Sequence, residues 1–172
     1  MLEMTAEKVE LSGRQIATKL IPIENIAGDD QEDTRLLRQM ALDARDYLAS
    51  FSWCREIYES YFGGGVGGIF AVFLFHIHPA NPEVDPWIWI VVGDIPSAYL
   101  PLSDAGSPHE VFEKYIDGMR RWIKAACNGD QKAATSPDVP PMNLPATPEW
   151  AERLKGRLDG ISEISPFFPS WT

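Results

Sequence analysis

Residues 69–99 read IFAVFLFHIHPANPEVDPWIWIVVGDIPSAY, two strongly apolar runs separated by a connector rich in Pro, Asn and Asp. Each run is too short to span a membrane, is rich in aromatic and β-branched residues, and is bounded by Gly or Pro. These features favour strands over helices. The stretch therefore predicts a β-hairpin with strands at about 69–78 and 87–95.

Both faces of this predicted hairpin are apolar, because side chains alternate between the two faces of a strand. The predicted faces are Ile69, Ala71, Phe73, Phe75 and Ile77 against Phe70, Val72, Leu74, His76 and His78 in the first run, and Trp87, Trp89 and Val91 against Ile88, Ile90 and Val92 in the second. A sheet of this kind needs cover on both faces, from helices, another sheet or a second copy of the protein.

Two amphipathic helices are predicted to supply that cover. The first begins at Asp30, where Glu32 and Asp33 add negative charge at the N-terminus, and carries apolar residues at helical spacing to Phe51. We expect residues 53–61 to continue it or to form a second short helix. The second begins at Ser107, with the S-x-x-E capping box closed by Glu110, and ends at the Asn-Gly pair 128–129.

This order of elements predicts an α+β fold with a small antiparallel sheet flanked by amphipathic helices. At 172 residues the chain fits a single domain. Residues 1–28 are predicted to be an arm or edge strands, with Pro22 restricting any strand there to an edge. Residues 29–128 form the predicted core and 129–147 a Pro-rich extended connection. A final helix and an aromatic tail, 148–172, are expected to pack back on the core.

The charge distribution limits the classes of partner. The formal net charge is -10, and no Lys or Arg occurs between Arg55 and Lys114, so binding to nucleic acid is disfavoured. Basic proteins and metal cations are compatible with this charge. Cys54 and Cys127 show no metal-binding spacing and are expected to be reduced thiols in helical segments. No export signal or membrane segment is visible, so a cytoplasmic location is expected.

A glycine run at 63–68 contains the spacing GxGxxG at Gly63, Gly65 and Gly68. Phosphate-binding loops of this type lead from a strand into a helix, whereas this run is predicted to lead from a helix into a strand. A helix C-cap followed by a turn is therefore favoured over a phosphate site.

His76 and His78 are two residues apart on a predicted strand, so both imidazoles point to one face. With Asp85 or Asp94 as a third ligand they could hold a metal ion for a hydrolase. The alternative is that the two histidines only mark the exit of the strand before Pro79. We favour this alternative, so no metal or other cofactor is predicted.

Candidate binding residues are Trp87, Trp89 and Asp94. The two tryptophans share one face and have the size and polarity of interface anchors or of an aromatic ligand wall, although such residues more often belong to a core. Asp94 follows a glycine at the end of an apolar run, where a carboxylate either caps a turn or acts in a cleft.

The segments SFSWC, GVGGIFAVFLF and WIWIVVGDIPSAYL, within about residues 41–123, resemble a family of small, acidic, uncharacterised bacterial proteins. The resemblance implies no activity, cofactor or catalytic residue. Small acidic single-domain proteins include immunity proteins that neutralise basic toxins, which is an analogy of composition. The sequence therefore favours a non-enzymatic protein-binding domain, immunity-like or regulatory, with a homodimer as one form. The alternatives are the metal-dependent hydrolase and a small-ligand module with an aromatic pocket.

Overall fold

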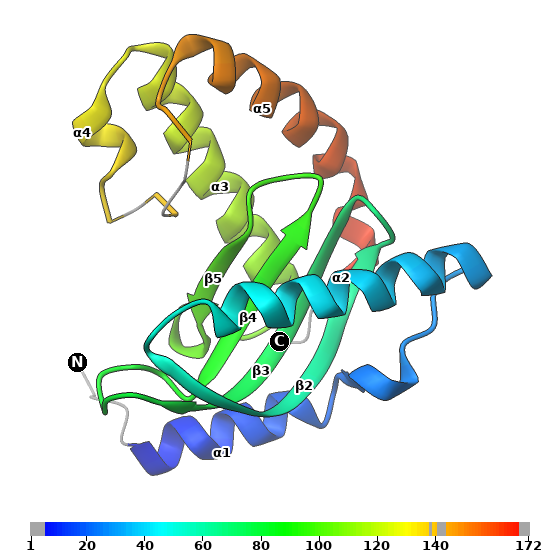
Figure 1. Cartoon of the computed structure of the whole chain (residues 1–172). Helices are drawn as coiled ribbons and strands as arrows, with labels where there is room; N and C mark the ends of the chain where they lie inside the picture. The colour runs from blue at the N-terminus through cyan, green and yellow to red at the C-terminus, as the bar shows by residue number, and fades with distance from the viewer. Residues whose placement is uncertain (1–5, 138, 141–143, 169–172) are drawn as a thin grey trace.

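The computed structural model describes residues 6–137, 139, 140 and 144–168. At its centre is a five-stranded antiparallel sheet whose strands follow one another in chain order, β1-β2-β3-β4-β5 (Figure 1). The strands are β1 (Ile21–Pro22), β2 (Cys54–Val66), β3 (Phe70–Pro79), β4 (Trp87–Gly93) and β5 (Ala98–Pro101). The helices in the described part are α1 (Ala6–Ala17), α2 (Gln31–Ala49), α3 (Pro108–Cys127), α4 (Gln131–Ala134) and α5 (Pro148–Ile161), with short 3-10 helices η1 (Ile23–Asn25), η2 (Leu102–Asp104) and η3 (Ser162–Phe167). The fold is α+β, as predicted.

The predicted hairpin is the middle of this sheet. Strands β3 and β4 pair from Phe70 opposite Gly93 to His76 opposite Trp87. Strands β2 and β5 flank them, and because helices pack on both faces of the sheet, most residues of both strands are fully buried. The hairpin prediction is confirmed, with β4 ending slightly earlier than expected.

The two predicted faces belong to two separate cores (Figure 1). Helix α2 covers one face, α1 and α3 cover the other, and α5 packs against α3. The sheet residues of the α2 core are Phe62, Ala71, Phe73, Phe75, Ile77, Ile88, Ile90 and Val92. Those of the opposite core are Phe70, Val72, Leu74, Trp87, Trp89 and Val91. Helices therefore provide the cover on both faces that the sequence demands.

The predicted starts of the helices are confirmed. Asp30 accepts a hydrogen bond from the backbone N–H of Asp33 at 2.7 Å and caps α2. Ser107 caps α3 through the N–H of Glu110, and the Glu110 carboxylate accepts from the N–H of Gly106 at 3.0 Å. Each cap satisfies N–H groups that the first helical turn leaves without partners.

The prediction of helix for residues 53–61 is wrong. Helix α2 ends at Ala49 with Ser50 as its C-cap, a turn follows, and the chain enters the long strand β2 at Cys54. This segment carries β-branched and aromatic side chains, and β3 offers it a complete antiparallel ladder. Cys54 is consequently half-buried in a strand, and burial raises the pKa of its thiol.

The glycine run completes β2 and turns the chain into β3, so the predicted helix-to-strand order is also wrong. Gly68 adopts a φ of 77°, which favours glycine. The N–H of Gly67 donates to the Asp33 carboxylate at 2.7 Å, and a Cβ on Gly67 would lie 2.7 Å from the same oxygen. Glycine here allows the hairpin turn to lie against the start of α2.

The two ends of the chain differ in part from prediction. Residues 6–17 form helix α1, which the sequence did not indicate, whereas Pro22 does lie in an edge strand. Residues 131–134 of the Pro-rich connection form the short helix α4. From the tail, Phe168 is buried and stacks on Phe112 at 4.9 Å, which confirms the predicted packing of this residue. Trp171 lies outside the described residues.

Candidate functional site

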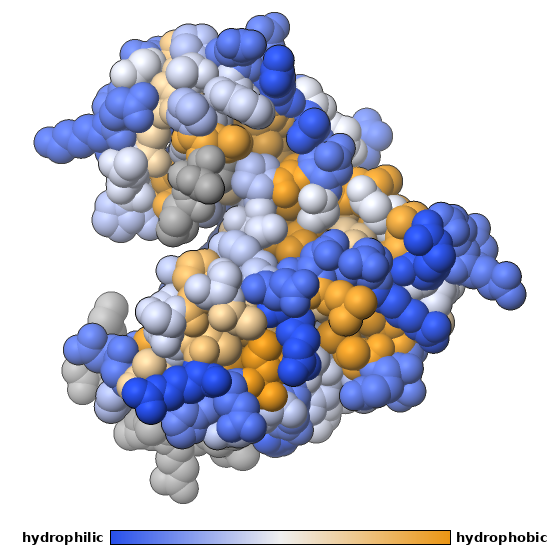
Figure 2. All heavy atoms as spheres, viewed as in Figure 1, coloured by the Kyte–Doolittle hydropathy of each residue, from blue (hydrophilic) through white to orange (hydrophobic). Residues whose placement is uncertain are grey.

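A groove lies between the end of α2, the β4–β5 connection and α5. Figure 2 shows the molecule hollowed between the lobe that carries α4 and α5 and the body below it. The groove has a volume of about 880 Å³, and we call it the α2–α5 groove. It is lined by Tyr47, Phe51, Gly93, Asp94, Ile95, Pro96, Ser97, Leu144, Trp150, Arg153, Leu154 and Arg157.

The β4–β5 connection is held in place at both of its ends. The N–H of Asp94 donates to the carbonyl of Ile69 at 3.0 Å, and a Cβ on Gly93 would lie 2.2 Å from that oxygen, so the close approach requires glycine. Further along, the buried Tyr115 hydroxyl donates to the carbonyl of Pro96 at 2.7 Å. This wall of the groove is therefore preformed.

Aromatic side chains form the opposite wall and its support. Phe51 packs edge-on against Tyr47, with ring centroids 5.1 Å apart, and stacks on Trp53 at 4.9 Å. Burial raises the pKa of Tyr47 to about 12, so its phenol stays neutral at physiological pH and keeps its hydrogen-bond donor. Across the groove, Trp150 is exposed on the first turn of α5. Such a site combines apolar area with a few polar groups, as ligand sites do.

Three charged side chains also line the groove: Asp94, Arg153 and Arg157. Arg157 Nη1 lies 3.6 Å from Asp94 Oδ1, and Arg153 Nη2 lies 3.5 Å from Glu149 Oε1. The guanidinium of Arg153 also lies 5.2 Å from the centre of the Trp150 ring. All four paired side chains are more than half exposed, and exposed ion pairs of this kind contribute little stability.

A second hollow of about 870 Å³ lies beside β5, and Leu144 lines both it and the groove, so the two are adjacent. Tyr99, Leu100 and Pro101 of this edge strand form one side, and α3 and the α4 region form the other. Together the two hollows lie along the junction between the sheet and the part of the molecule that carries α3, α4 and α5.

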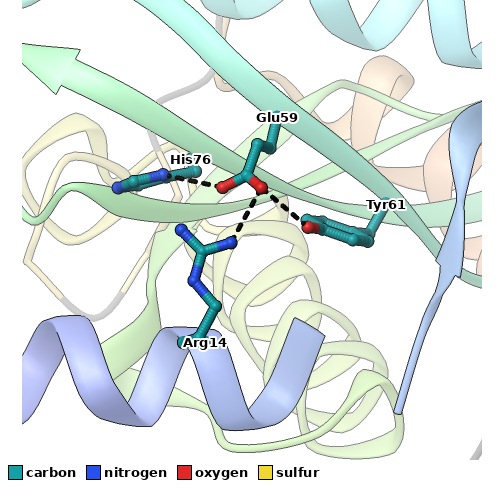
Figure 3. Close-up of polar contacts among 4 residues, drawn as sticks. All are labelled: Arg14, Glu59, Tyr61 and His76. Carbon is teal, nitrogen blue, oxygen red and sulfur yellow. Dashed lines mark hydrogen bonds and ion pairs between the residues drawn. The ribbon is translucent and has the colours of Figure 1, made fainter. Parts of the chain in front are cut away.

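A second polar feature is a cluster on the α1 side of the sheet, formed by Arg14, Glu59, Tyr61 and His76 (Figure 3). Glu59 Oε1 accepts from Arg14 Nη1 at 2.7 Å and from the Tyr61 hydroxyl at 3.1 Å. Glu59 Oε2 lies 3.0 Å from His76 Nδ1. The cluster thus joins α1 to β2 and β3.

The electrostatics of this cluster follow from the same contacts. The hydrogen bond from Arg14, with help from His76 and Tyr61, lowers the pKa of Glu59 to about 2. His76 stacks on the buried Trp87 with ring centroids 4.3 Å apart, and the Arg14 guanidinium lies 5.2 Å from the centre of the same ring. The hydrogen bond from Arg14 fastens α1 to the sheet, and the contacts with Tyr61 and His76 hold the Glu59 carboxylate in place within the sheet. The cluster is therefore a structural connection.

The residues predicted for a metal site lie in different surroundings. His76 contacts Glu59, the His78 ring lies 2.8 Å from the Tyr58 hydroxyl, and Asp85 accepts from the backbone N–H groups of Trp87 and Ser103. Asp94 belongs to the other end of the β3–β4 ladder. Among the described residues, no group of three His, Cys, Asp or Glu side chains is arranged to hold a metal ion. The hydrolase stays a prediction without a supporting geometry.

The predicted binding residues are separated by the fold. Trp87 and Trp89 are fully buried, and Trp89 Nε1 donates to the carbonyl of Ala105 at 2.8 Å. Neither presents a wall to a ligand in this structure. Asp94, by contrast, lines the α2–α5 groove. The sequence did not indicate the contributions of the other lining side chains, Tyr47, Phe51, Trp150, Arg153 and Arg157. The only signal was an amphipathic final helix with an aromatic residue in its first turn.

A scan against protein-family models, a search of curated proteins and a search of solved structures each found no match. The resemblance to small bacterial proteins therefore stays a prediction. In the part of the chain that the structure describes, no helix combines the length and apolarity that crossing a bilayer requires.

Proposed function

We propose that this chain is a non-enzymatic protein-binding domain that accepts a segment of a partner protein in the α2–α5 groove. The observation that carries the proposal is the groove itself. It is open to solvent, mainly apolar, and walled by a connection that Gly93 and Tyr115 hold in place. A preformed site of this kind binds without the cost of ordering its own loops.

The shape of the site favours a protein segment over a small molecule. The volume of about 880 Å³ alone would suit either class. However, a second hollow lies next to the groove and shares Leu144 with it, so an extended chain could occupy both. The net charge of -10 supports long-range steering of a partner that is basic overall, as an immunity-like or regulatory role would require.

Site-specific photo-crosslinking tests this proposal. A benzoylphenylalanine replaces Trp150 in the groove, and a matched variant carries it at Leu42, which is 56% exposed on α2 and does not line the groove. Irradiation of cells that express each variant should give an adduct of one defined mass from position 150 and not from position 42. The captured protein, once purified, should bind the wild-type chain directly and lose affinity at least about tenfold for Trp150→Ala, which removes an exposed side chain of the groove.

The other outcomes contradict the proposal in distinct ways. An adduct of twice the chain mass would assign the groove to a second copy of this protein. Equal adducts from positions 150 and 42 would place binding elsewhere. A small compound retained in the native mass spectrum, without a protein adduct, would support the small-ligand alternative. Circular dichroism melting of the Trp150→Ala variant checks that it is folded before its affinity is compared.

A further inference from the structure

Helix α5 presents two cations to the groove although the protein as a whole is strongly acidic. Arg153 and Arg157 are four residues apart, so they lie on one side of the helix, and both line the α2–α5 groove. Lys155 lies between them in the sequence and does not line it. Asp94 is the acidic residue in the lining, so the lining carries one more positive than negative charge.

The present contacts of the two guanidinium groups leave them able to bind another anion. Their distances to Asp94 and Glu149, 3.6 and 3.5 Å, exceed the usual N–H to O hydrogen-bond range of about 2.7–3.2 Å. A guanidinium has five N–H donors in a planar fork that matches a carboxylate. A bound carboxylate could therefore gain close charge-assisted hydrogen bonds at the cost of only weak, exposed pairs.

We propose that the groove recognises an internal peptide segment in which an acidic side chain stands next to a large apolar one. Arg153 and Arg157 bind the carboxylate, while Phe51 and Trp150 contact the apolar side chain. An internal segment is specified because a chain bound in the groove could extend into the adjacent hollow that shares Leu144 with it. This inference rests on the proposed function and adds the chemistry of the partner segment to it.

The net charge of -10 does not prevent recognition of such a segment. At physiological ionic strength, charges separated by more than about 8 Å are largely screened, so the nearest guanidinium groups dominate the field at the groove. The segment would belong to a partner that is neutral or basic overall. The overall negative charge then steers the partner at long range, whereas Arg153 and Arg157 recognise the segment at short range.

Asp94 gives the inference a sharp test, because it competes with the peptide carboxylate for Arg157. Changing Asp94 to Asn should strengthen the binding of an acidic segment, whereas changing the arginines should weaken it. If the groove instead bound a basic segment through Asp94, changing Asp94 to Asn would weaken that binding and changing the arginines would strengthen it. The two substitutions together therefore distinguish the sign of the recognised charge.

The experiment uses three dye-labelled peptides, acetylated and amidated, that differ only in the charge at two positions: GGEFLEFGG, GGQFLQFGG and GGKFLKFGG. Their affinities for the full-length chain are measured by fluorescence anisotropy. We expect the Glu peptide to bind about tenfold more tightly than the Gln peptide. The double variant Arg153→Gln, Arg157→Gln should abolish this preference, Asp94→Asn should enlarge it, and the control Lys155→Gln should leave it unchanged.

The position of binding is followed through the indole N–H resonance of Trp150, which is assigned with Trp150→Phe. If all three peptides shift this resonance and bind with equal affinity, the charge preference is overturned. The proposed function would still stand. Preference for the Lys peptide, weakened by Asp94→Asn, would overturn it in the opposite direction. If no peptide shifts the Trp150 resonance, the inference is overturned, and the crosslinking experiment decides separately on the proposed function.

Discussion

Glu59 shows how a single carboxylate can secure a helix to a sheet. It accepts hydrogen bonds from Arg14 of α1 and from Tyr61 of its own strand, and its second oxygen lies against His76 of β3 (Figure 3). Charge-assisted hydrogen bonds favour the ionised form, which is why the pKa of Glu59 falls to about 2. The contribution to stability is moderated by solvent, since about a third of the side chain, 34%, is exposed.

We expect Glu59→Gln to lower the free energy of unfolding by about 1 kcal/mol at pH 7, after allowance for this exposure. A carboxylate with a lowered pKa stabilises the fold above its unfolded pKa, and this stabilisation is lost as the pH falls through the folded value. The difference in the free energy of unfolding between wild type and variant should therefore become smaller as the pH falls from about 4.5 toward 2. Urea unfolding at pH 7 and pH 3 measures it, with the exposed Glu56→Gln as control. A difference that does not vary with pH would contradict this account.

Helix α1 depends on one small residue for its approach to the sheet. Gly13 is buried, and a Cβ at this position would lie 2.3 Å from ring atoms of Trp87. Glycine is a poor helix former, with a cost of about 1 kcal/mol relative to alanine, so its presence inside α1 has a packing reason. Gly156 in α5 offers the contrast, because it is exposed and open space surrounds its Cβ position.

These two glycines should respond to the same substitution with opposite signs. Gly156→Ala is expected to raise the free energy of unfolding by about 0.5–1 kcal/mol through helix propensity. Gly13→Ala should lower it by about 1–3 kcal/mol, because the methyl group forces α1 or Trp87 to move. Thermal unfolding of both variants is the measurement. A stabilising Gly13→Ala would show that α1 does not pack on Trp87 as described.

At the scale of the whole molecule, the central sheet separates two cores that have no residue in common. Its strands couple the two cores because they contribute side chains to both. Phe73 belongs to the α2 core, whereas Trp87, Trp89 and Trp122 belong to the opposite core. All of these side chains are buried, and the strands β3 and β4 supply both cores with alternate residues. Loss of packing on one face should therefore weaken the other face through the shared strands.

We expect Phe73→Ala to lower the free energy of unfolding by about 3–5 kcal/mol. Because the sheet is shared, the transition seen by tryptophan fluorescence, which reports largely on the opposite core, should shift together with the transition seen by far-ultraviolet circular dichroism. The two curves are recorded in urea on the same samples. Separate midpoints would mean that the two faces unfold independently.

Elements that depend on neighbouring residues could be predicted from the sequence, whereas elements that depend on contacts between distant residues could not. The apolar runs of β3 and β4 and the caps at Asp30 and Ser107 were predicted because alternation and capping are properties of neighbouring residues. Strand β2 was missed because its identity depends on pairing with β3, and pairing is not visible in the segment itself. Helix α1 was missed because its packing depends on the contact between Gly13 and Trp87, which lie far apart in sequence.

The sequence by itself determined a central hairpin apolar on both faces, two helices to cover it, and a net charge that disfavours nucleic acid. Tertiary structure alone decided which side chains line the groove in which we propose that a partner binds. It buried Trp87 and Trp89 in a core and left Asp94 on a groove with Tyr47, Trp150 and Arg157. The physical reason is that burial and proximity depend on how distant segments pack together, whereas strand and helix periodicity is a property of each segment alone.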